Sequence, residues 1–176
     1  MDSDGRFLWF QHEKGQEIDL AGIEVVGAES EFKFWPPDQT KQLPIRISCG
    51  VDTFMLGFPE NVAAQDIFPI WKRGTIAAEP SIDRLDQLPI YLVDAATGKG
   101  MSGSPTFAYS ANGYIDEENN YQFGVSGSRF LGIYSGRYGG IGEANLTMGR
   151  VWKAEVVYEM LDKRSPGKVA KSQRSK

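Results

Sequence analysis

A serine flanked by glycines, Ser102, is the candidate nucleophile of this sequence. It lies in residues 98–107, which read GKGMSGSPTF. A serine nucleophile in acyl transfer needs an exposed hydroxyl and nearby backbone N–H groups that stabilise the developing oxyanion, and flanking glycines allow such a turn. Because Gly-Ser-Gly turns also occur in ordinary loops, the motif alone is compatible with either a nucleophile or a simple connection.

A second segment has the same spacing of glycine and serine. Residues 124–128 read GVSGS, but no proline follows and Arg129 comes next, so we interpret this segment as a hairpin turn. The G-x-S-x-G motif of α/β-hydrolases does not fit Ser102, because Ser104 occupies its last glycine position. That fold also needs a histidine after the serine, and none follows Ser102.

The chain of 176 residues contains one cysteine, Cys49, and one histidine, His12. This count excludes an internal disulfide and a structural zinc site built from Cys and His, and we expect no metal and no cofactor. Catalysis that depends on histidine must use His12 or a residue outside this sequence. Low cysteine content suits a reducing compartment, and residues 1–10 lack the features of a signal peptide, so we expect a cytoplasmic protein.

Short apolar and aromatic runs recur between turn-forming residues, and 20 glycines and 9 prolines punctuate the chain. This pattern is typical of an all-β barrel or sandwich. Helical periodicity is confined to residues 151–161, which predict a terminal helix packed on the barrel. Two polar stretches, residues 36–43 and 110–120, predict surface loops.

The end of the chain differs in charge from the rest. Residues 163–176 contain six basic and no acidic residues, although the whole chain has a net charge of -4. A basic tail on an acidic body could bind nucleic acid, but its composition is typical of a solvated end. We therefore predict a disordered basic tail over residues 164–176, and expect neither nucleic-acid nor membrane binding.

The GMSGSP segment resembles the GDSGGP box of trypsin-like serine peptidases, and more closely that of their disulfide-poor bacterial members. Residues 17–25 (EIDLAGIEV) are similar to the strand that carries the catalytic aspartate, and residues 130–137 (FLGIYSGR) to the strand that lines the substrate cleft. The predicted helix at residues 151–161 corresponds to the C-terminal helix of the family. The resemblance covers residues 5–163.

This resemblance implies a mainly β fold, a trypsin-like antiparallel β-barrel with a C-terminal α-helix. Residues 1–30 would be the end of a first barrel that carries the catalytic acid. Residues 31–163 would form the second barrel, with the nucleophile and the helix.

The resemblance also implies roles for individual residues. Ser102 would be the nucleophile, Asp19 the acid that orients the base, and Ser135 the hydroxyl that supports this acid. The backbone N–H groups of Gly100 and Ser102 would form the oxyanion hole. Met101 replaces the aspartate that pairs with a new N-terminus in activatable members. The turn must then be held by packing, and we expect no activation by a defined N-terminal cleavage.

Substrate recognition follows from the same resemblance. Tyr134, Ser135 and Gly136 would pair with the substrate backbone as an added strand. Ala96 would lie at the base of the specificity pocket and Gly136 and Gly139 along its wall. None of these residues is a carboxylate that could hold an arginine or lysine, so we expect a small or apolar substrate side chain.

The base is the main departure from the family pattern. His12 lies only seven residues before Asp19, whereas the family's histidine is several tens of residues upstream, and we expect His12 to be a surface residue. Either a segment outside this sequence supplies the base, or the chain has lost it. We expect little or no hydrolysis by this chain alone.

Two functions remain open. The first is a serine endopeptidase that forms an acyl-enzyme on Ser102, with a polypeptide as its substrate. The alternative is a catalytically inactive trypsin-like β-barrel that binds a peptide or protein. An incomplete two-barrel fold would expose a face through which the chain could associate.

Overall fold

The side chains of strand β3 (Asp52–Gly57) alternate between buried and half-buried, which is the period of a strand with one face on a core. In the computed structural model, which describes residues 9–25, 36–37, 41–65, 68–82, 88–138 and 148–167, this strand pairs with antiparallel neighbours on both sides. β3 therefore lies within a larger sheet.

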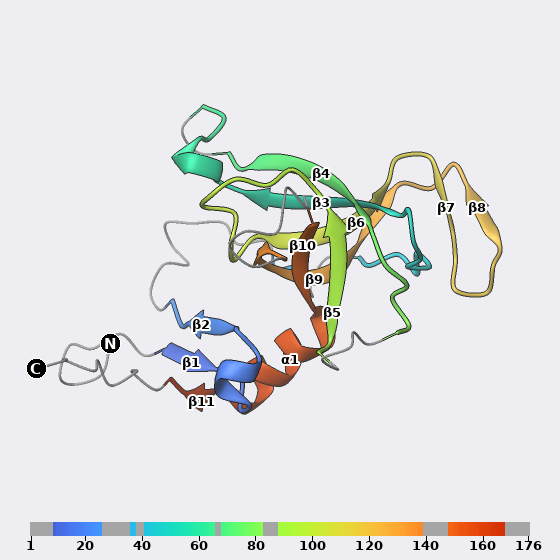
Figure 1. The fold of residues 1–176 in the computed structure, drawn as a ribbon. Helices are drawn as coiled ribbons and strands as arrows, with labels where there is room; N and C mark the ends of the chain where they lie inside the picture. The colour runs from blue at the N-terminus through green and yellow to red at the C-terminus, as the bar shows by residue number, and fades with distance from the viewer. Residues whose placement is uncertain are drawn as a thin grey trace, which may run out of the picture. The chain divides into compact units, whose positions relative to one another are not determined.

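Within the described residues, six antiparallel strands close into a barrel in the order β10-β5-β4-β3-β6-β9 (Figure 1). The other five strands are β4 (Ile70–Ile76), β5 (Ile90–Asp94), β6 (Pro105–Ser110), β9 (Gly127–Arg137) and β10 (Met148–Lys153). Closure removes the exposed edges that an open sheet presents. The predicted mainly β fold with an antiparallel barrel and a C-terminal helix is confirmed.

Apolar side chains from the barrel strands fill its interior. Met55, Val93, Leu131, Tyr134 and Val151 are almost fully buried in one cluster. Tyr134 fits closely against β10, since a Cβ on Gly149 would lie 2.4 Å from its ring. This packing fixes the inner face of β9, the strand that resembles the family's substrate-binding strand.

The predicted loop at residues 110–120 is largely a β-hairpin. β7 (Gly113–Ile115) pairs with β8 (Tyr121–Phe123), and Figure 1 shows the hairpin extending from the barrel. Asp116 closes its turn, accepting hydrogen bonds from the backbone N–H of Asn120 and from Gln122 Nε2, each at 2.8 Å. The polar composition reflects exposure of the hairpin rather than irregular backbone. Of the other predicted loop, residues 38–40 lie outside the described residues.

Helix α1 (Ala154–Lys163) begins three residues later than predicted. Val151 and Trp152 pair instead with Tyr91 and Ile90 of β5, and β10 continues to Lys153. Apolar residues at the end of a strand and the start of a helix form one uninterrupted pattern, which explains the misplaced boundary. No helix among the described residues is both long and apolar enough to cross a lipid bilayer.

The described residues fall into two compact units, with the division inside α1. Unit 1 takes its residues from 1–33 and from Tyr158 onward, and unit 2 from 34 to Val157. Unit 2 contains the barrel. The predicted boundary between first and second barrel near residue 30 stays a prediction.

Unit 1 contains a small sheet in the order β11-β1-β2. Its strands are β1 (Trp9–Gln11), β2 (Ala21–Ile23) and β11 (Ser165–Pro166), and the 3-10 helix η1 (Gly15–Glu17) connects the first two. Ser165 and Pro166, which we expected in a disordered tail, pair with Gln11 and Phe10. Residues 168–176 of that predicted tail lie outside the described residues.

Candidate active site

Ser102 lies in a tight turn between β5 and β6 of unit 2. Gly100 and Gly103 have φ values of +86° and +89°, in the left-handed region that glycine adopts without strain. Ser102 is exposed, while its neighbours Met101 and Ser104 are buried. The backbone therefore presents the Ser102 hydroxyl to solvent and directs the adjacent side chains into the protein, as a nucleophile turn requires.

The two glycines are needed for different reasons. A Cβ on Gly100 would lie 2.7 Å from the carbonyl oxygen of Phe58, whereas a Cβ on Gly103 would have no heavy atom within 4 Å. Gly100 thus lets the chain approach the end of β3 closely, and Gly103 provides only a left-handed bend. Gly100→Ala and Gly103→Ala are therefore a matched pair of substitutions that differ in whether the new Cβ meets a neighbouring atom.

Met101 anchors the turn in the barrel core. Its side chain is fully buried and belongs to the barrel's apolar cluster. A Cβ on Gly57 would lie 3.0 Å from the Met101 sulfur, so the strand end and the turn are in close contact. The turn is held by packing, as expected from the sequence, while the expected absence of activation by cleavage stays a prediction.

Backbone hydrogen bonds fasten the turn to β9. Gly103 donates to the carbonyl of Tyr134 at 2.8 Å, and Tyr134 donates to the carbonyl of Ser104 at 2.9 Å. Two residues further along β9, a Cβ on Gly136 would lie 3.6 Å from Ser102 Oγ. The structure therefore brings Ser102 and Gly136 together.

Beside this serine, one edge of β9 has no strand partner among the described residues. β6 pairs with β9 only as far as Ile133, and beyond it Gly136 and Arg137 pair with β10 on the other side. Ser135 is the extra residue of a β-bulge, a feature common beside active sites. Because the backbone groups of Tyr134 are already bonded to the turn, an added substrate strand could pair with Ser135 and Gly136 but not with Tyr134 as we expected.

Two amides of the turn are free to stabilise an anion. The N–H groups of Gly103 and Ser104 are bonded to Tyr134 and Met101. Among the described residues, those of Gly100 and Ser102 have no acceptor. They are the two donors predicted for the oxyanion hole, and open backbone donors beside a nucleophile can stabilise a tetrahedral oxyanion.

The Ser135 hydroxyl is buried without a hydrogen-bond partner in the part of the chain that the structure describes. An unsatisfied buried hydroxyl costs about 1–3 kcal/mol, so such groups are rare in native proteins. Its orphaned state is compatible with the supporting role predicted for this residue.

Ala96 and its neighbour Thr97 precede the nucleophile turn. Ala96 is exposed, and Thr97 is buried with its hydroxyl hydrogen-bonded to that of Tyr134. Arg137 donates to the carbonyl of Thr97 from Nη2 at 2.7 Å and from Nε at 3.3 Å. Sequence reasoning missed Arg137, although it directly follows the glycine predicted to line the pocket. Gly139 lies outside the described residues.

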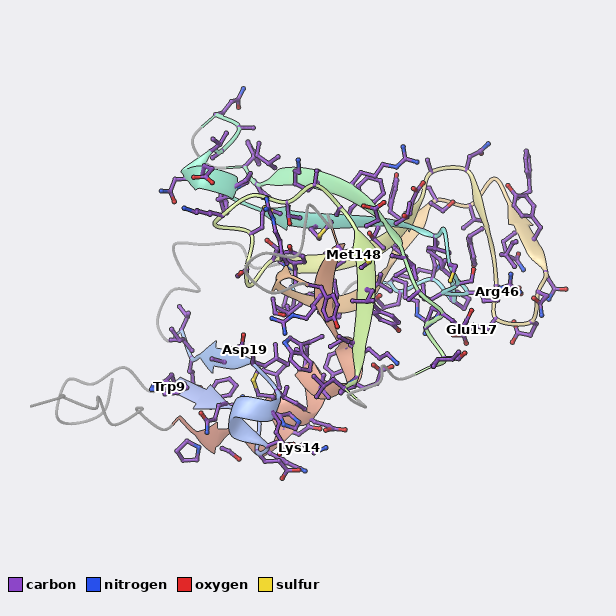
Figure 2. All side chains as sticks on the ribbon, in the orientation of Figure 1. Trp9, Lys14, Asp19, Arg46, Glu117 and Met148 are labelled. Atoms are coloured by element: carbon purple, nitrogen blue, oxygen red, sulfur yellow. The ribbon has the colours of Figure 1, made fainter. Side chains whose placement is uncertain are left out.

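Asp19 lies in unit 1, directly before β2 (Figure 2). Successive side chains alternate in direction here, so that Ile18 and Leu20 are buried and Asp19 between them is exposed. Its carboxylate has no hydrogen-bond or ion-pair partner among the described residues. Ser102 belongs to unit 2, so each residue is placed only within its own unit.

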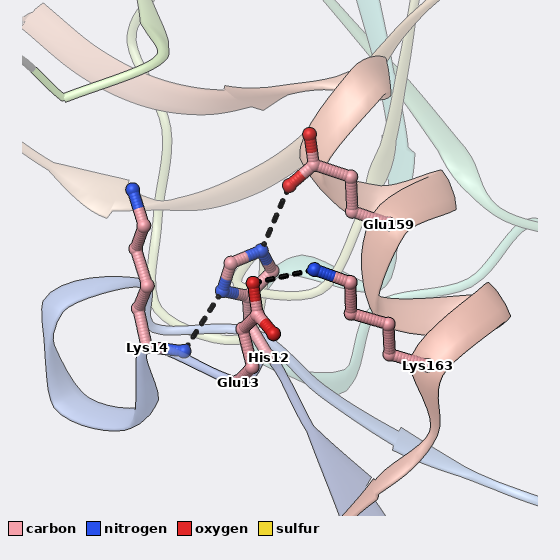
Figure 3. A network of polar contacts seen from close by, with 5 residues as sticks. All are labelled: His12, Glu13, Lys14, Glu159 and Lys163. Carbon is pink, nitrogen blue, oxygen red and sulfur yellow. Dashed lines mark hydrogen bonds and ion pairs between the residues drawn. The ribbon is translucent and has the colours of Figure 1, made fainter.

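His12 is buried, so the expectation of a surface histidine is wrong. Only 1% of its surface is exposed. Its Nε2 lies 3.2 Å from Glu159 Oε2, and the backbone N–H of Lys14 donates to Nδ1 at 3.2 Å (Figure 3). Since Nδ1 accepts a hydrogen bond, the neutral ring carries its proton on Nε2 and donates it to Glu159. Neither nitrogen is available as a general base.

An ion pair lies beside these hydrogen bonds. Lys163 Nζ lies 2.5 Å from Glu13 Oε1 (Figure 3). The hydrogen bond from Lys163 lowers the pKa of the Glu13 carboxyl, and the reciprocal bond raises the pKa of Lys163. This network joins the start of the described chain to the end of α1, which indicates a structural role for His12.

The segment Gly124–Ser128 lies in the connection from β8 to β9. Gly124 also has a positive φ, of +71°, and Ser126 is exposed. The next residue, Gly127, already pairs with Ser110 of β6, so Ser126 is an exposed serine at the start of β9. It provides a matched control for Ser102.

A cavity of about 310 Å³ lies elsewhere in unit 2, near the end of β6 distant from the nucleophile turn. Ile45, Asp52, Tyr109 and Tyr114 are among its lining residues. β6 spans six residues, about 20 Å, so this cavity is separate from Ser102. The described residues contain no group of three or more His, Cys, Asp or Glu side chains arranged to hold a metal ion.

Comparisons with known proteins give distant structural similarity. No family model matches the chain, and no curated protein matches it. Among solved structures, a serine-to-alanine variant of Rv3671c from M. tuberculosis, in an inactive form, is 16% identical with a TM-score of 0.45; the match covers 82% of this chain and 57% of that one. The inactive form of Rv3671c protease is 20% identical with a TM-score of 0.43, and the match covers 70% and 53%. This chain thus spans little more than half the length of these neighbours.

Proposed function

We propose that this chain carries the nucleophile portion of a serine endopeptidase that cleaves peptide bonds through an acyl-enzyme on Ser102. One arrangement carries the proposal: an exposed Ser102 in a packed turn, with the free amides of Gly100 and Ser102 beside it and the open edge of β9 adjacent. Acyl transfer from an extended peptide requires these three parts together with a base.

The chemistry begins with an extended substrate that pairs with β9 at Ser135 and Gly136. Ser102 Oγ attacks the carbonyl carbon of the scissile bond and loses its proton to a base. The oxyanion of the tetrahedral intermediate accepts hydrogen bonds from the N–H groups of Gly100 and Ser102. The C–N bond then breaks, the amine leaves with a proton from the conjugate acid of the base, and water hydrolyses the acyl ester.

The base is not His12 in this proposal, because both of its ring nitrogens are hydrogen-bonded within unit 1. We propose that a histidine in a segment outside this sequence acts as the base, and that Asp19 and Ser135 have the roles that the family resemblance implies for them. Removing the base of such a triad abolishes most of the rate enhancement and leaves a residual contribution from the oxyanion hole. This chain alone should therefore hydrolyse peptides very slowly.

A second function, peptide binding without cleavage, is supported by the same buried His12. A chain whose only histidine is engaged in structure can still add a peptide to the open edge of β9. This function requires the strand edge but not the Ser102 hydroxyl.

Chemical replacement of the base distinguishes the two functions. The chain is incubated with a fluorophosphonate probe at increasing concentrations of imidazole, in parallel with Ser102→Ala and Ser126→Ala. For the peptidase, labelling of the wild type and of Ser126→Ala rises with imidazole, and Ser102→Ala is not labelled. Equal labelling of Ser102→Ala excludes Ser102 as the nucleophile. An absence of labelling together with binding of an extended peptide supports the binding module.

A further inference from the structure

Arg137 is the next residue on β9 after one that lies against the candidate nucleophile. It follows Gly136, the residue whose Cβ position lies 3.6 Å from Ser102 Oγ. Its guanidinium reaches across to the carbonyl of Thr97, five residues before Ser102 in the chain. The side chain therefore connects the segment before the nucleophile turn with the end of β9 where a substrate would pair.

The charge on Arg137 is not neutralised by any carboxylate among the described residues. In contrast, Arg73, Arg129 and Arg164 face Asp52, Glu117 and Glu24. Arg137 is instead held by a neutral carbonyl oxygen, which accepts two of the five N–H donors of its guanidinium. The remaining three donors and the full positive charge are available to a ligand.

Thr97 is itself firmly placed. It is buried, its hydroxyl is bonded to that of Tyr134, and Tyr134 belongs to the barrel core. The carbonyl that holds Arg137 is thus fixed by the core, so the guanidinium is oriented before a substrate arrives. Such preorganisation reduces the entropy lost on binding.

The space next to this charge belongs to the substrate residue under attack. The carbonyl carbon of that substrate residue must lie against Ser102 Oγ. The side chain of the same residue branches from the Cα atom that is bonded to this carbon. Gly136 has no side chain to occupy the adjacent volume, and the guanidinium of the next residue, Arg137, is bonded to the Thr97 carbonyl before the turn. A carboxylate at this position can form a charge-assisted, bidentate pair with a guanidinium.

We propose that Arg137 selects substrates in which the residue contributing the scissile carbonyl is acidic, Asp or Glu. This inference rests on the proposed function, since it places the substrate at Ser102. It replaces the expectation of a small or apolar side chain, which considered Ala96 and the glycines but not Arg137. Arg137 is a specificity residue, and Tyr134 is a positioning residue that acts through Thr97.

Equilibrium binding tests the proposal with the chain as it is. Four fluorescein-labelled pentapeptides differ only in the last residue, which is Glu, Gln, Ala or Lys, and all end in a free carboxylate. Their dissociation constants are measured by fluorescence anisotropy. We expect the Glu peptide to bind about fivefold to tenfold more tightly than the Gln peptide, because a charge-assisted bond replaces a neutral one. The preference should shrink as salt screens the exposed pair.

Substitutions distinguish the effect of the Arg137 charge from a general effect on folding. Arg137→Gln keeps an amide that can reach the Thr97 carbonyl and should abolish the preference for Glu over Gln. Arg137→Lys keeps a positive charge and should retain part of the preference for the Glu peptide. Arg73→Ala removes an exposed arginine elsewhere on the barrel and should leave the preference unchanged. Tyr134→Phe removes the bond to Thr97 and should reduce the preference while the Ala peptide binds as before.

The outcomes distinguish this inference from the function on which it rests. Equal binding of the Glu and Gln peptides, or a preference that survives in Arg137→Gln, overturns the role of Arg137 and leaves the peptidase proposal intact. If none of the four peptides binds and imidazole does not promote labelling of Ser102, both proposals fail. Far-ultraviolet circular dichroism of each variant verifies that the barrel is folded.

Discussion

A Cβ on Gly136 would lie 3.6 Å from the Oγ of Ser102, although 34 positions separate the two residues in the chain. This proximity follows from the bonds that Gly103 and Ser104 make to Tyr134, which fasten the nucleophile turn to β9. The serine and the strand edge beside it therefore form one rigid feature of the barrel, and substitutions in the turn should affect both its stability and its chemistry.

Gly100→Ala should destabilise the protein more than Gly103→Ala. Both substitutions place a side chain at a left-handed φ, which costs about 1–2 kcal/mol. At Gly100 the new Cβ also meets the carbonyl oxygen of Phe58, so we expect a total loss of about 2–4 kcal/mol. Urea denaturation measures both free energies of unfolding. Equal losses of unfolding free energy in the two variants would mean that the close approach of Gly100 to the Phe58 carbonyl does not contribute to stability.

Met101→Ala should weaken the packing that holds the turn around Ser102 against the barrel core. Truncating a buried methionine costs about 2–5 kcal/mol, whereas Met101→Leu, which nearly conserves volume, should cost less than about 1.5 kcal/mol. We expect imidazole-promoted labelling of Ser102 to fall in Met101→Ala and to persist in Met101→Leu. If the alanine variant is labelled at the wild-type rate while folded, packing of Met101 does not hold the turn.

His12→Ala should reduce stability but not the reactivity of Ser102. The substitution leaves the Lys14 amide and the Glu159 carboxylate without their partner, at a cost of about 1–3 kcal/mol. Thermal unfolding measures this loss, and Glu159→Gln should show a smaller one. Labelling of the folded His12→Ala protein in imidazole should equal that of the wild type, and a large decrease would indicate that His12 takes part in catalysis.

Acid should weaken the β7–β8 hairpin through Asp116. The hydrogen bond from Gln122, followed by those from Asn120, lowers the pKa of this carboxyl in the folded protein. A lowered folded pKa stabilises the protein above the carboxyl's unfolded value, near 4, and this contribution is lost as the pH falls through the folded pKa. The stability difference between the wild type and Asp116→Asn, measured from pH 7 to pH 2, should therefore shrink in acid.

Glu118→Gln changes an exposed carboxylate on the same turn and is the control for that titration. It should follow the wild type over the whole range. A difference between the wild type and Asp116→Asn that stays constant with pH would contradict the role of Asp116.

Several features could be predicted from local pattern. The glycines around Ser102 indicated a turn that could expose its hydroxyl, and the recurring apolar runs indicated an all-β barrel or sandwich. Burial of Met101 followed from an apolar residue in the middle of that turn. Each of these depends on properties of a few consecutive residues, such as the φ freedom of glycine or the period of a strand.

Other features depend on residues that are distant in the chain. His12 was expected at the surface because it lies only seven residues before Asp19, yet it is buried and its partner Glu159 lies 147 positions away. The helix start was misplaced because Val151 pairs with Tyr91 of β5. Local sequence contains no information about which remote segment covers or pairs with a given residue.

The sequence by itself determined the glycine-bounded turn around Ser102, the mainly β composition and the presence of a single histidine. Only the tertiary structure decided that Tyr134 is already bonded to that turn, that Ser135 and Gly136 form the open edge, and that Arg137 reaches Thr97 from 40 positions away. The physical reason is that a turn's conformation is set by the steric limits of its own residues. The strand edge beside Ser102, and the residues that reach it from other parts of the chain, are set by strand pairing across the closed barrel.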